Sequence, residues 1–463
     1  MRIVDIARSA YTSTPAPIRR RLAPLVALVP RSLKYGPAFE RWRRDIKRSE
    51  VEPAFAVERA QSQLQALLIK ASAGSAFWRN LLGAAAFATF ELEALASVPI
   101  TTKQMMREAG DAARVDGLPA LIKATTSGSN AEAPFEFLVD ADRSVREFAF
   151  VTTAWGRAGY RPGDPRAVLR GFRLDDASAA YQWDPALGEL RLAVFPLGPT
   201  DAAAMADEIE RRRISYIHGY PSAIELFARH LDSAGRRLAN PIRGIFPISE
   251  PVFAHQRDLF AKVFPQAETV PFYGMSEKVA FAVERRGEPG VYTFEPLYGL
   301  AELVDEDGRA IVTPGTEGRL LGTGFISTGM PFIRYDTGDS ARLVEAATRA
   351  NGWRLTVRDI APRRKPDFLI AGDGGKIVAT DLVPEDIALL RGLAEWQFVQ
   401  GSPGVATLRF VPAADGGASD AERLTRALER RTDGRLRFDI EQVASIASGA
   451  HGKRAFIIRN ITG

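Results

Sequence analysis

The chain of 463 residues contains no cysteine and only four histidines. The absence of cysteine excludes disulfide bonds, thiolate catalysis and cysteine-ligated zinc. No two histidines are spaced as a metal-binding pair, so a histidine-built metal site is not expected. No apolar run approaches the ~20 residues that span a bilayer, and the N-terminus lacks the small-residue cleavage site of a secretory signal. We therefore expect a cytoplasmic protein without a transmembrane segment.

Charge is unevenly distributed along the chain. The net charge is +5, yet residues 1–50 hold 12 Lys and Arg against 4 Asp and Glu, whereas the remaining residues hold 49 against 52. We interpret the basic segment as a solvated helical face; the alternative is a weak contact with an anionic surface such as a membrane. No nucleic-acid partner is expected, because no aromatic interleaving or recognised binding module accompanies the basic residues.

The pattern along the chain predicts an α/β fold. The first 110 residues are expected to be largely helical, and Phe55–Gly74 has apolar residues at helical spacing. Beyond residue 120, short β-rich runs alternate with longer helical ones, which favours mostly parallel sheets with packed helices. The expected strands include 133–140, 166–172, 215–220, 242–249 and 267–274. The expected helices include 141–159, 201–214, 221–235 and 251–264.

The C-terminal part of the chain changes character twice. Helical patterns vanish from 290 to 360, which predicts an antiparallel subdomain. After the proline-rich, polar stretch near residue 362 we expect a small mobile α+β domain. The predicted domains are 1–362, a large N-terminal domain, and 363–463, a small C-terminal domain.

The stretch "KATTSGSNAEAPFEF", Lys123–Phe137, has the composition of a loop that wraps phosphates. Thr126, Ser127, Gly128 and Ser129 offer hydroxyls and free backbone N–H groups. The loop has no lysine after Lys123, and the chain has no Walker A sequence. A Ser/Thr/Gly loop alone is weak evidence for a phosphate site.

Three further segments carry groups that bind nucleotides. "VPFYGMSE" ends a predicted strand with an aromatic ring, Ser276 and the carboxylate of Glu277, an oxygen ligand of the kind that Mg²⁺ prefers. "MPFIRYDTGD" places Asp339 after a Thr-Gly turn, and "SGAHGKRAFII" carries Lys453 in a glycine-flanked loop. The alternatives are an ordinary strand end turning at Gly274, a β-turn, and an exposed tail lysine.

Together and in this order, these segments resemble the adenylate-forming enzymes, the acyl-CoA synthetases and their relatives. They are most similar to the phenylacetate–CoA ligase-like branch that includes capsular-polysaccharide-associated members. "HGYPSAIELFARHL", "PISEPVFAHQRDLF", "YGLAELVDEDG" and "RRKPDFLI" add to the resemblance, which spans most of the chain.

The resemblance implies that a carboxylic acid reacts with ATP to give an acyl-adenylate, with Mg²⁺ as cofactor. It implies catalytic roles for Lys453 and for the metal ligand Glu277, which we expect to be exposed at the strand end. It places the remaining nucleotide contacts at Thr126, Ser127, Gly128, Ser129, Ser249, Glu250, Pro251, Tyr273, Gly274, Ser276, Asp339 and Arg364. Lys453 would supply a cation that the phosphate loop lacks.

The expected substrate is an aryl or aliphatic acid in an apolar pocket around Tyr220, Phe246 and Phe272. His218, Gly219 and Met275 complete that predicted pocket. The acyl acceptor is coenzyme A, an amine or a hydroxyl compound. The alternative function is a catalytically silent, nucleotide-binding homologue that acts as a scaffold, because the phosphate loop is irregular and Pro366 lies at the expected hinge.

Overall fold

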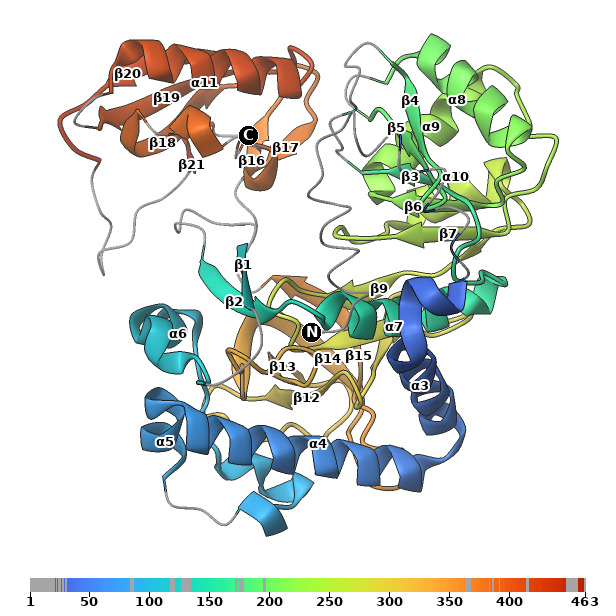
Figure 1. The fold of residues 1–463 in the computed structure, drawn as a ribbon. Helices are drawn as coiled ribbons and strands as arrows, with labels where there is room; N and C mark the ends of the chain where they lie inside the picture. The colour runs from blue at the N-terminus through green and yellow to red at the C-terminus, as the bar shows by residue number, and fades with distance from the viewer. Residues whose placement is uncertain are drawn as a thin grey trace. The chain divides into compact units, whose positions relative to one another are not determined.

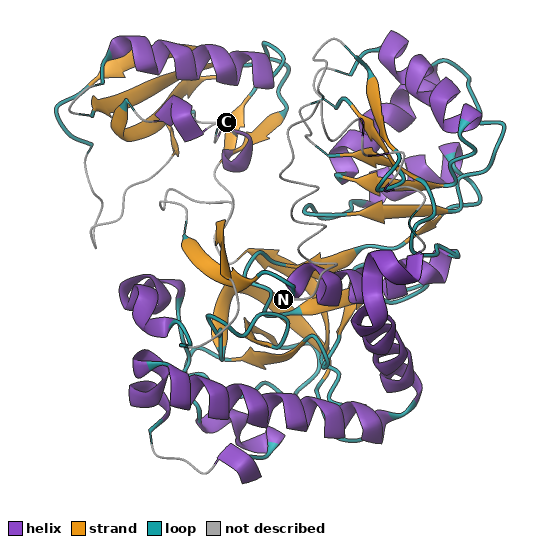
Figure 2. Ribbon diagram, in the orientation of Figure 1, coloured by secondary structure: helices purple, strands orange, loops and turns teal. Residues whose placement is uncertain are grey.

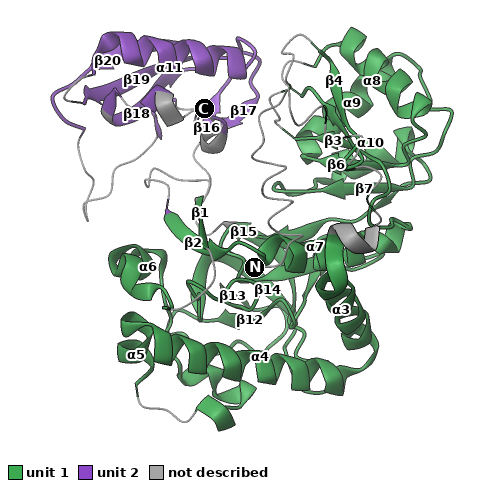
Figure 3. Cartoon of the chain, viewed as in Figure 1, with its two compact units in different colours: residues 1–124, 136–363 green, residues 125–135, 364–463 purple. Residues whose placement is uncertain are grey.

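The chain is divided into two compact units (Figure 3). The larger consists of residues 1–124 and 136–363, and the smaller of residues 125–135 and 364–463. The structure, a computed structural model, describes residues 21, 23, 26, 29, 31–83, 87–116, 121–125, 135–170, 174, 179–194, 197–362, 368–382, 384, 387–390, 392–413, 416–446 and 457–461.

The described N-terminal residues form a helical layer of the larger unit (Figure 1). Helix α4 begins at Pro53, a favourable first position for proline, and ends at Gly74 as its pattern predicts. Its buried residues recur every three or four positions, which places one apolar stripe against the core. The other elements of this layer are α3 (Arg31–Val51), α5 (Ala76–Leu82), α6 (Lys103–Ala109), η1 (Phe87–Thr89), η2 (Leu92–Ser97) and η3 (Gly110–Ala113).

A six-stranded sheet follows, in the order β4-β5-β3-β6-β7-β8. All its neighbouring strands are parallel except the β4–β5 hairpin. One face packs against α8, α9 and α10 through a continuous apolar cluster. The bounds are β3 (Arg166–Leu169), β4 (Tyr181–Asp184), β5 (Glu189–Leu192), β6 (Tyr216–Gly219), β7 (Gly244–Pro247), β8 (Glu268–Thr269), α7 (Arg143–Trp155), η4 (Gly156–Ala158), α8 (Pro199–Arg211), α9 (Pro221–Ser233) and α10 (Ala254–Val263).

The second large sheet is antiparallel and has seven strands in the order β12-β13-β14-β15-β11-β10-β9. It begins before residue 290, because β9 and β10 also belong to it. A separate two-stranded sheet joins β1 (Leu121–Thr125) and β2 (Glu136–Asp140). The seven strands are β9 (Phe272–Gly274), β10 (Phe281–Glu284), β11 (Val291–Phe294), β12 (Gly299–Val304), β13 (Glu317–Gly324), β14 (Tyr335–Glu345) and β15 (Thr356–Pro362).

The prediction of one continuous strand over 267–274 is wrong. The segment forms β8, which pairs with β7 in the parallel sheet, and β9, which pairs with β10 in the antiparallel sheet. Pro271 lies between them, and proline has no N–H to donate to a strand ladder. The chain therefore changes sheets at this point, which puts Tyr273 in the antiparallel sheet.

The smaller unit mixes helix and sheet around its own core (Figure 2). Its four-stranded sheet has the order β20-β19-β18-β21, and helix α11 contributes Leu424 and Leu428 to the core. The bounds are β16 (Phe368–Ile370), β17 (Lys376–Val378), β18 (Leu393–Ser402), β19 (Val405–Pro412), β20 (Arg437–Gln442), β21 (Ile457–Arg459), η5 (Ala379–Leu382), η6 (Ile387–Leu390) and α11 (Ala418–Arg431). The predicted fold class, an α/β protein with a small α+β domain, is confirmed.

Among the helices that the structure describes, none combines the length and the apolar character that crossing a membrane requires.

An aromatic cluster joins the second face of the parallel sheet to α7. The ring of Phe246 on β7 stacks on Trp155 of α7 with centroids 4.5 Å apart and planes 6° from parallel. Tyr160 and Tyr216 contact the same ring, and Phe246 is completely buried. Phe246 therefore packs as a core residue.

The burial of Phe246 gives a stability prediction. Phe246→Ala should lower the free energy of unfolding by about 3–5 kcal/mol, because it removes a fully enclosed ring and leaves a cavity beside Trp155. Urea unfolding followed by tryptophan fluorescence measures this. Phe253→Ala is the control, since Phe253 is 55% exposed and its loss should cost about 0.5 kcal/mol or less. Equal effects of the two substitutions would contradict the core assignment.

Candidate functional site

Glu277 is a buried carboxylate at the end of the β9 turn. It is 7% exposed, which corrects the expectation of an exposed strand-end residue. The turn after Gly274 closes through the Lys278 N–H, which donates to the Met275 carbonyl at 3.2 Å. The hydroxyl of Tyr335 on β14 donates to Glu277 Oε1 at 3.1 Å. The turn therefore carries its carboxylate inward, beneath a tyrosine of the same sheet.

Glu277 differs from the other buried carboxylates among the described residues. Five Asp or Glu residues are buried in that part of the chain. Four of them form ion pairs with arginine: Asp184 with Arg191, Glu208 with Arg211 and Arg212, Glu284 with Arg257, and Glu295 with Arg354. Within the same described residues, Glu277 has the Tyr335 hydroxyl and no ion pair. A buried charge without a cation is costly, so this carboxylate is suited to a cation supplied from outside the protein.

The surroundings of Glu277 shift its pKa. Burial raises the pKa above its usual value, and the nearby charge of Asp339 adds to the rise. Hydrogen bonds from its own backbone N–H and from Tyr335 oppose this rise in pKa, as does the positive charge of Lys103. A divalent cation at the carboxylate would favour the ionised form further.

Tyr273 and Asp339 form a second polar pair beside Glu277. The Tyr273 hydroxyl donates to Asp339 Oδ2 at 2.6 Å, which connects β9 to β14. Burial, followed by the negative charge of Asp339, raises the pKa of Tyr273 well above its usual value. The Asp339 N–H donates to Thr337 Oγ1 at 3.1 Å, and Gly338 between them has φ of 84°. The expectation of a turn before Asp339 is corrected, because Thr337, Gly338 and Asp339 all lie within β14, where Asp339 pairs with Pro362 of β15.

The structure adds Lys103, which our sequence reasoning missed. Thr101 forms a parallel bridge with Tyr335. Its N–H donates to the Arg334 carbonyl at 3.0 Å, and its carbonyl accepts the Asp336 N–H at 2.8 Å. This bridge brings Lys103, the first residue of α6, to where its charge lowers the pKa of Glu277. The available signal was the run "PITTK", in which Thr102 caps α6 by accepting the Met105 N–H at 3.2 Å.

Ser249–Pro251 follow β7 at the carboxyl end of the parallel sheet, where ligands bind in open α/β folds. Ser249 has φ of 65°, an unusual conformation for a residue other than glycine. Glu250 holds the start of α9, because Ser222 donates its N–H at 3.1 Å and its hydroxyl at 3.0 Å to the Glu250 carboxylate. Gly219 ends β6 beside these residues; a Cβ there would lie 2.2 Å from the Leu169 carbonyl oxygen.

The aromatic residues of the predicted pocket divide between two apolar clusters. Phe246 lies in the aromatic core, and Phe272 packs partly buried against the same cluster. Tyr220 packs against the cluster formed with α8, α9 and α10 instead. Gly274 is exposed, while Met275 and Ser276 are half-buried in the turn before Glu277. We therefore place Phe246 in the core; the pocket roles of the other residues stay predictions.

His218 is a buried, neutral side chain on β6. Its ring lies 4.8 Å from the Trp155 ring, and its Nδ1 has no hydrogen-bond partner among the described residues. Burial lowers the pKa of His218 well below its usual value, and the charges of Arg166 and Arg170 add to this. The imidazole is therefore uncharged at neutral pH.

Several predicted site residues lie outside the described residues. They are Thr126, Ser127, Gly128 and Ser129 of the phosphate loop, Arg364, and Lys453. The described residues bring together Tyr273, Glu277, Tyr335 and Asp339, and through its charge Lys103.

The donor set at Glu277 fits magnesium. Mg²⁺ is usually held by one or two carboxylates together with substrate phosphates and water. No group of three or more His, Asp or Glu side chains suited to a metal occurs in the part of the chain that the structure describes. A site built on Glu277 would therefore depend on oxygen ligands from a bound substrate.

No protein-family model matches the chain. The chain is 23% identical over 370 residues to Protein CapK of Staphylococcus aureus, covering 79% of this chain and 80% of that protein. Its fold is similar to 2-hydroxyisobutyryl-CoA ligase solved with 2-HIB-AMP and CoA in the thioesterification state. That match has a TM-score of 0.56 and 19% identity, and covers 89% of this chain and 92% of the other.

The same ligase in the postadenylation state, with 2-HIB-AMP, gives a TM-score of 0.53 at 20% identity and the same coverage of both chains. The predicted resemblance to adenylate-forming enzymes is confirmed at the level of the fold.

The raised pKa of Glu277 gives a prediction on stability and pH. Above the folded-state pKa the ionised carboxylate destabilises the folded chain; below the usual value of 4.5 it is protonated in both states and that cost is absent. Glu277→Gln should therefore increase the free energy of unfolding at pH 7. The increase should shrink as the pH falls and vanish below about 4.5. Urea unfolding across this pH range is the measurement.

Glu295→Gln is the matched control for this substitution. It removes the carboxylate partner of Arg354, whose side chain is 17% exposed and which keeps its hydrogen bond to Ser49 Oγ, so it should cost about 1–3 kcal/mol at pH 7. A loss of stability in Glu277→Gln similar to that in the control would contradict the prediction.

Proposed function

We propose that the chain activates a carboxylic acid with ATP and then transfers the acyl group to a nucleophile. In the first step a carboxylate oxygen of the acid bonds to the α-phosphorus of ATP, and the bond to pyrophosphate breaks. The observation that carries the proposal is Glu277, the one described buried carboxylate without an ion pair, beside the Tyr273–Asp339 pair. The likeness in fold to a ligase solved with an acyl-AMP compound supports it.

The described residues would bind and orient ATP through their charges and hydrogen bonds. Glu277 would hold Mg²⁺, which supplies positive charge to the phosphates, and the Ser276 hydroxyl would bind a phosphate. Asp339 would accept the ribose hydroxyls, with the Tyr273 hydroxyl fixing one of its oxygens. Ser249–Pro251, at the carboxyl end of β7, would enclose the adenine together with the Tyr273 ring and Gly274. These groups act by positioning and electrostatic stabilisation rather than by covalent catalysis.

The remaining roles are proposals on residues outside the described part of the chain. Thr126, Ser127, Gly128 and Ser129 would bind the β- and γ-phosphates, and Arg364 would reach the ribose. Lys453 would meet the α-phosphate and the substrate carboxylate. We propose that residues 363–463 act as a mobile C-terminal domain that delivers Lys453 for the first step.

Coenzyme A is the acceptor that we propose first, because the ligase of similar fold was solved with CoA. An amine or a hydroxyl compound is the second class, since CoA binding is shown for that protein and not for this chain. The acid is proposed to be an aryl or aliphatic carboxylate, held near His218, Gly219 and Tyr220 at the end of β6 and near Phe272 and Met275 at β9.

Acid-dependent exchange of pyrophosphate into ATP tests the proposal. A panel of aryl and aliphatic acids is assayed with Mg²⁺, and each active acid is then supplied with CoA, amines or alcohols. We expect exchange with at least one acid and consumption of the adenylate by one acceptor class. ATP binding without exchange for any acid would favour the catalytically silent, nucleotide-binding homologue instead.

Glu277→Gln should lower the rate of exchange by on the order of 10²-fold, similar to the loss of one strong electrostatic group. The amide keeps an acceptor for the Tyr335 hydroxyl but loses the charge for Mg²⁺. Glu147→Gln is the matched control, because Glu147 pairs with the neighbouring Lys278 at 2.7 Å and has no assigned role in the site. Near wild-type exchange by Glu277→Gln at limiting Mg²⁺ would remove Glu277 from the metal site.

Lys453→Ala should lower acyl-adenylate formation by on the order of 10²-fold or more, while ATP affinity changes much less. The reason is that ordering a lysine side chain costs about 1–2 kcal/mol, which concentrated negative charge in the transition state offsets. Acyl transfer from a supplied adenylate should survive. Lys376→Ala, an exposed lysine of the smaller unit, is the control. Normal adenylate formation by Lys453→Ala would make Lys453 a surface lysine.

A further inference from the structure

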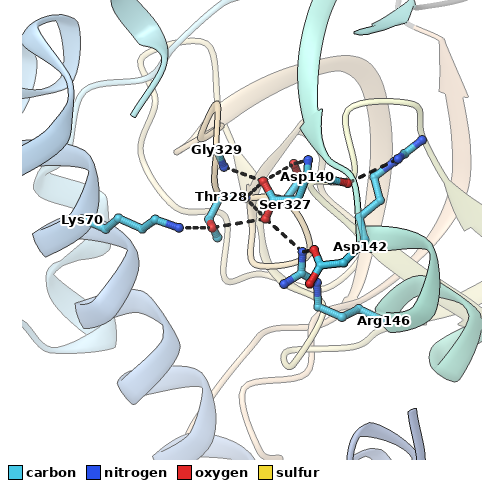
Figure 4. Close-up of polar contacts among 8 residues, drawn as sticks. Lys70, Asp140, Asp142, Arg146, Ser327, Thr328 and Gly329 are labelled. Carbon is cyan, nitrogen blue, oxygen red and sulfur yellow. Dashed lines mark hydrogen bonds and ion pairs between the residues drawn. The ribbon is translucent and has the colours of Figure 1, made fainter. Parts of the chain in front are cut away.

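Asp140, the last residue of β2, binds a turn 187 to 189 residues away in the chain (Figure 4). Its carboxylate accepts the Gly329 N–H at 2.7 Å and the Thr328 N–H at 3.2 Å. Its own N–H donates to Ser327 Oγ at 3.0 Å. The side chain is 14% exposed, so these bonds are largely shielded from water. One residue thus holds the backbone of the turn Ser327–Gly329.

Gly329 permits this close approach. A Cβ at this position would lie 2.2 Å from Leu121 Cδ2, on the first residue of β1, and 2.8 Å from Asp140 Oδ1. The Gly329 carbonyl accepts the Val115 N–H at 2.9 Å. The turn therefore lies against the first residue of β1 and the last residue of β2 at once.

The hydrogen bonds between Asp140 and Ser327–Gly329, here called the Asp140 anchor, connect two segments to which we assign ATP contacts. Leu121 and Asp140 lie at one end of the two-stranded sheet, and the opposite ends of its strands, Thr125 and Glu136, flank residues 126–135. On the other side, Ser327–Gly329 leads within ten residues to Asp339 on β14. The bonds of Asp140 therefore hold strands β1 and β2, which lead to the predicted phosphate loop, at a fixed distance from β14, which carries Asp339.

Two cationic side chains, Arg146 and Lys70, also contact Asp140 or the turn Ser327–Gly329. Arg146 Nη2 pairs with Asp140 Oδ2 at 2.9 Å and with Asp142 Oδ1 at 2.8 Å (Figure 4). Lys70 on α4 donates to Thr328 Oγ1 at 2.5 Å. Burial lowers the pKa of Lys70, and the charge of Asp140 opposes that shift. The network thus includes α4, β2, α7 and the turn before β14.

We propose that Asp140 is a positioning residue for ATP, which holds the phosphate-loop strands in register with the strand that carries Asp339. This inference rests on the proposed function, and it assigns Asp140 no contact with ATP itself. The carboxylate is required because both of its oxygens accept backbone N–H groups. An asparagine would present an NH₂ group to one of those donors in either orientation.

The test compares Asp140→Asn with Asp142→Asn in acid-dependent ATP–pyrophosphate exchange. Asp142 is the matched control: it binds the same Arg146, its side chain is 52% exposed, and its carboxylate makes no bond to the turn among the described residues. Asp140→Asn should raise the KM for ATP about tenfold or more, the size expected for a lost charged hydrogen bond. The KM for the acid and kcat should stay within about threefold of wild type. Asp142→Asn should leave all three parameters unchanged.

Ser327→Ala is a milder variant that keeps the charge of Asp140. It removes the acceptor of the Asp140 N–H and the long hydrogen bond, 3.4 Å, that the Ser327 hydroxyl donates to Asp140 Oδ1. It should raise the KM for ATP about threefold, roughly the value of one neutral hydrogen bond. If Asp140→Asn fails to fold, this variant decides the proposal. An unchanged KM for ATP in Ser327→Ala, or equal changes in the KM for ATP and for the acid, would overturn it.

Hydrogen exchange separates failure of the anchor from failure of the proposed function. In Asp140→Asn the amides of Thr328 and Gly329 should exchange about tenfold faster than in Asp142→Asn, because their acceptor is weakened. If wild-type chain makes no adenylate with any acid, the proposed function and the ATP role of Asp140 fail together. Unchanged exchange at Thr328 and Gly329 would overturn the anchor whatever the activity.

Discussion

The burial of Glu277 without an ion pair is the constraint on which the candidate site depends. The protein accepts a desolvated carboxylate there, although it pairs Asp184, Glu208, Glu284 and Glu295 with arginines elsewhere. The Tyr335 hydroxyl and the field of Lys103 compensate only part of that cost, since burial still raises the pKa of Glu277. A buried carboxylate in this state lowers the stability of the folded chain, and binding of a cation restores that stability. This behaviour is typical of a ligand site rather than of a structural ion pair.

Strand β14 supplies the other polar residues that surround Glu277 in the candidate site. Tyr335 at its start contacts Glu277, Thr337 accepts the Asp339 N–H, and Asp339 accepts the Tyr273 hydroxyl. The bridge from Thr101 to Tyr335 adds α6 to the same strand. Strands β15, β11 and β10 lie between β14 and β9 in the sheet order. The Tyr273–Asp339 bond therefore requires the sheet to curve until β9 approaches β14, because four strand spacings of about 4.8 Å exceed the reach of a tyrosine side chain.

Local sequence patterns predicted most helices and strands, whereas contacts between residues distant in sequence determined the change of sheet and the burial of the site residues. The βα alternation gave the parallel sheet and the helices α7 to α10, because periodicity is a property of neighbouring residues. The change of sheet at Pro271 could not be read from a run that is uniformly β-rich. The burial of Glu277 depends on Tyr335, 58 residues away, and that of Phe246 on Trp155. Lys103 and Asp140 had no chemical signature, since a lysine at a helix start and an aspartate after a strand are ordinary.

Asp140 and Glu277 show how hydrogen bonding separates two carboxylates that resemble each other in the sequence. Asp140 is the last residue of a short strand and Glu277 follows one, and both side chains are largely shielded from water. Asp140 accepts backbone N–H groups on both oxygens and pairs with Arg146, so its charge is compensated by the protein alone. Such a residue can hold two backbone segments together without any ligand. Glu277 accepts the Tyr335 hydroxyl and its own backbone N–H, but it has no ion pair among the described residues and its pKa is raised. Its charge is therefore only partly compensated until a cation binds. The number of donors around a buried carboxylate therefore distinguishes the residue that fixes the frame of the site from the residue that leaves a place for its ligand.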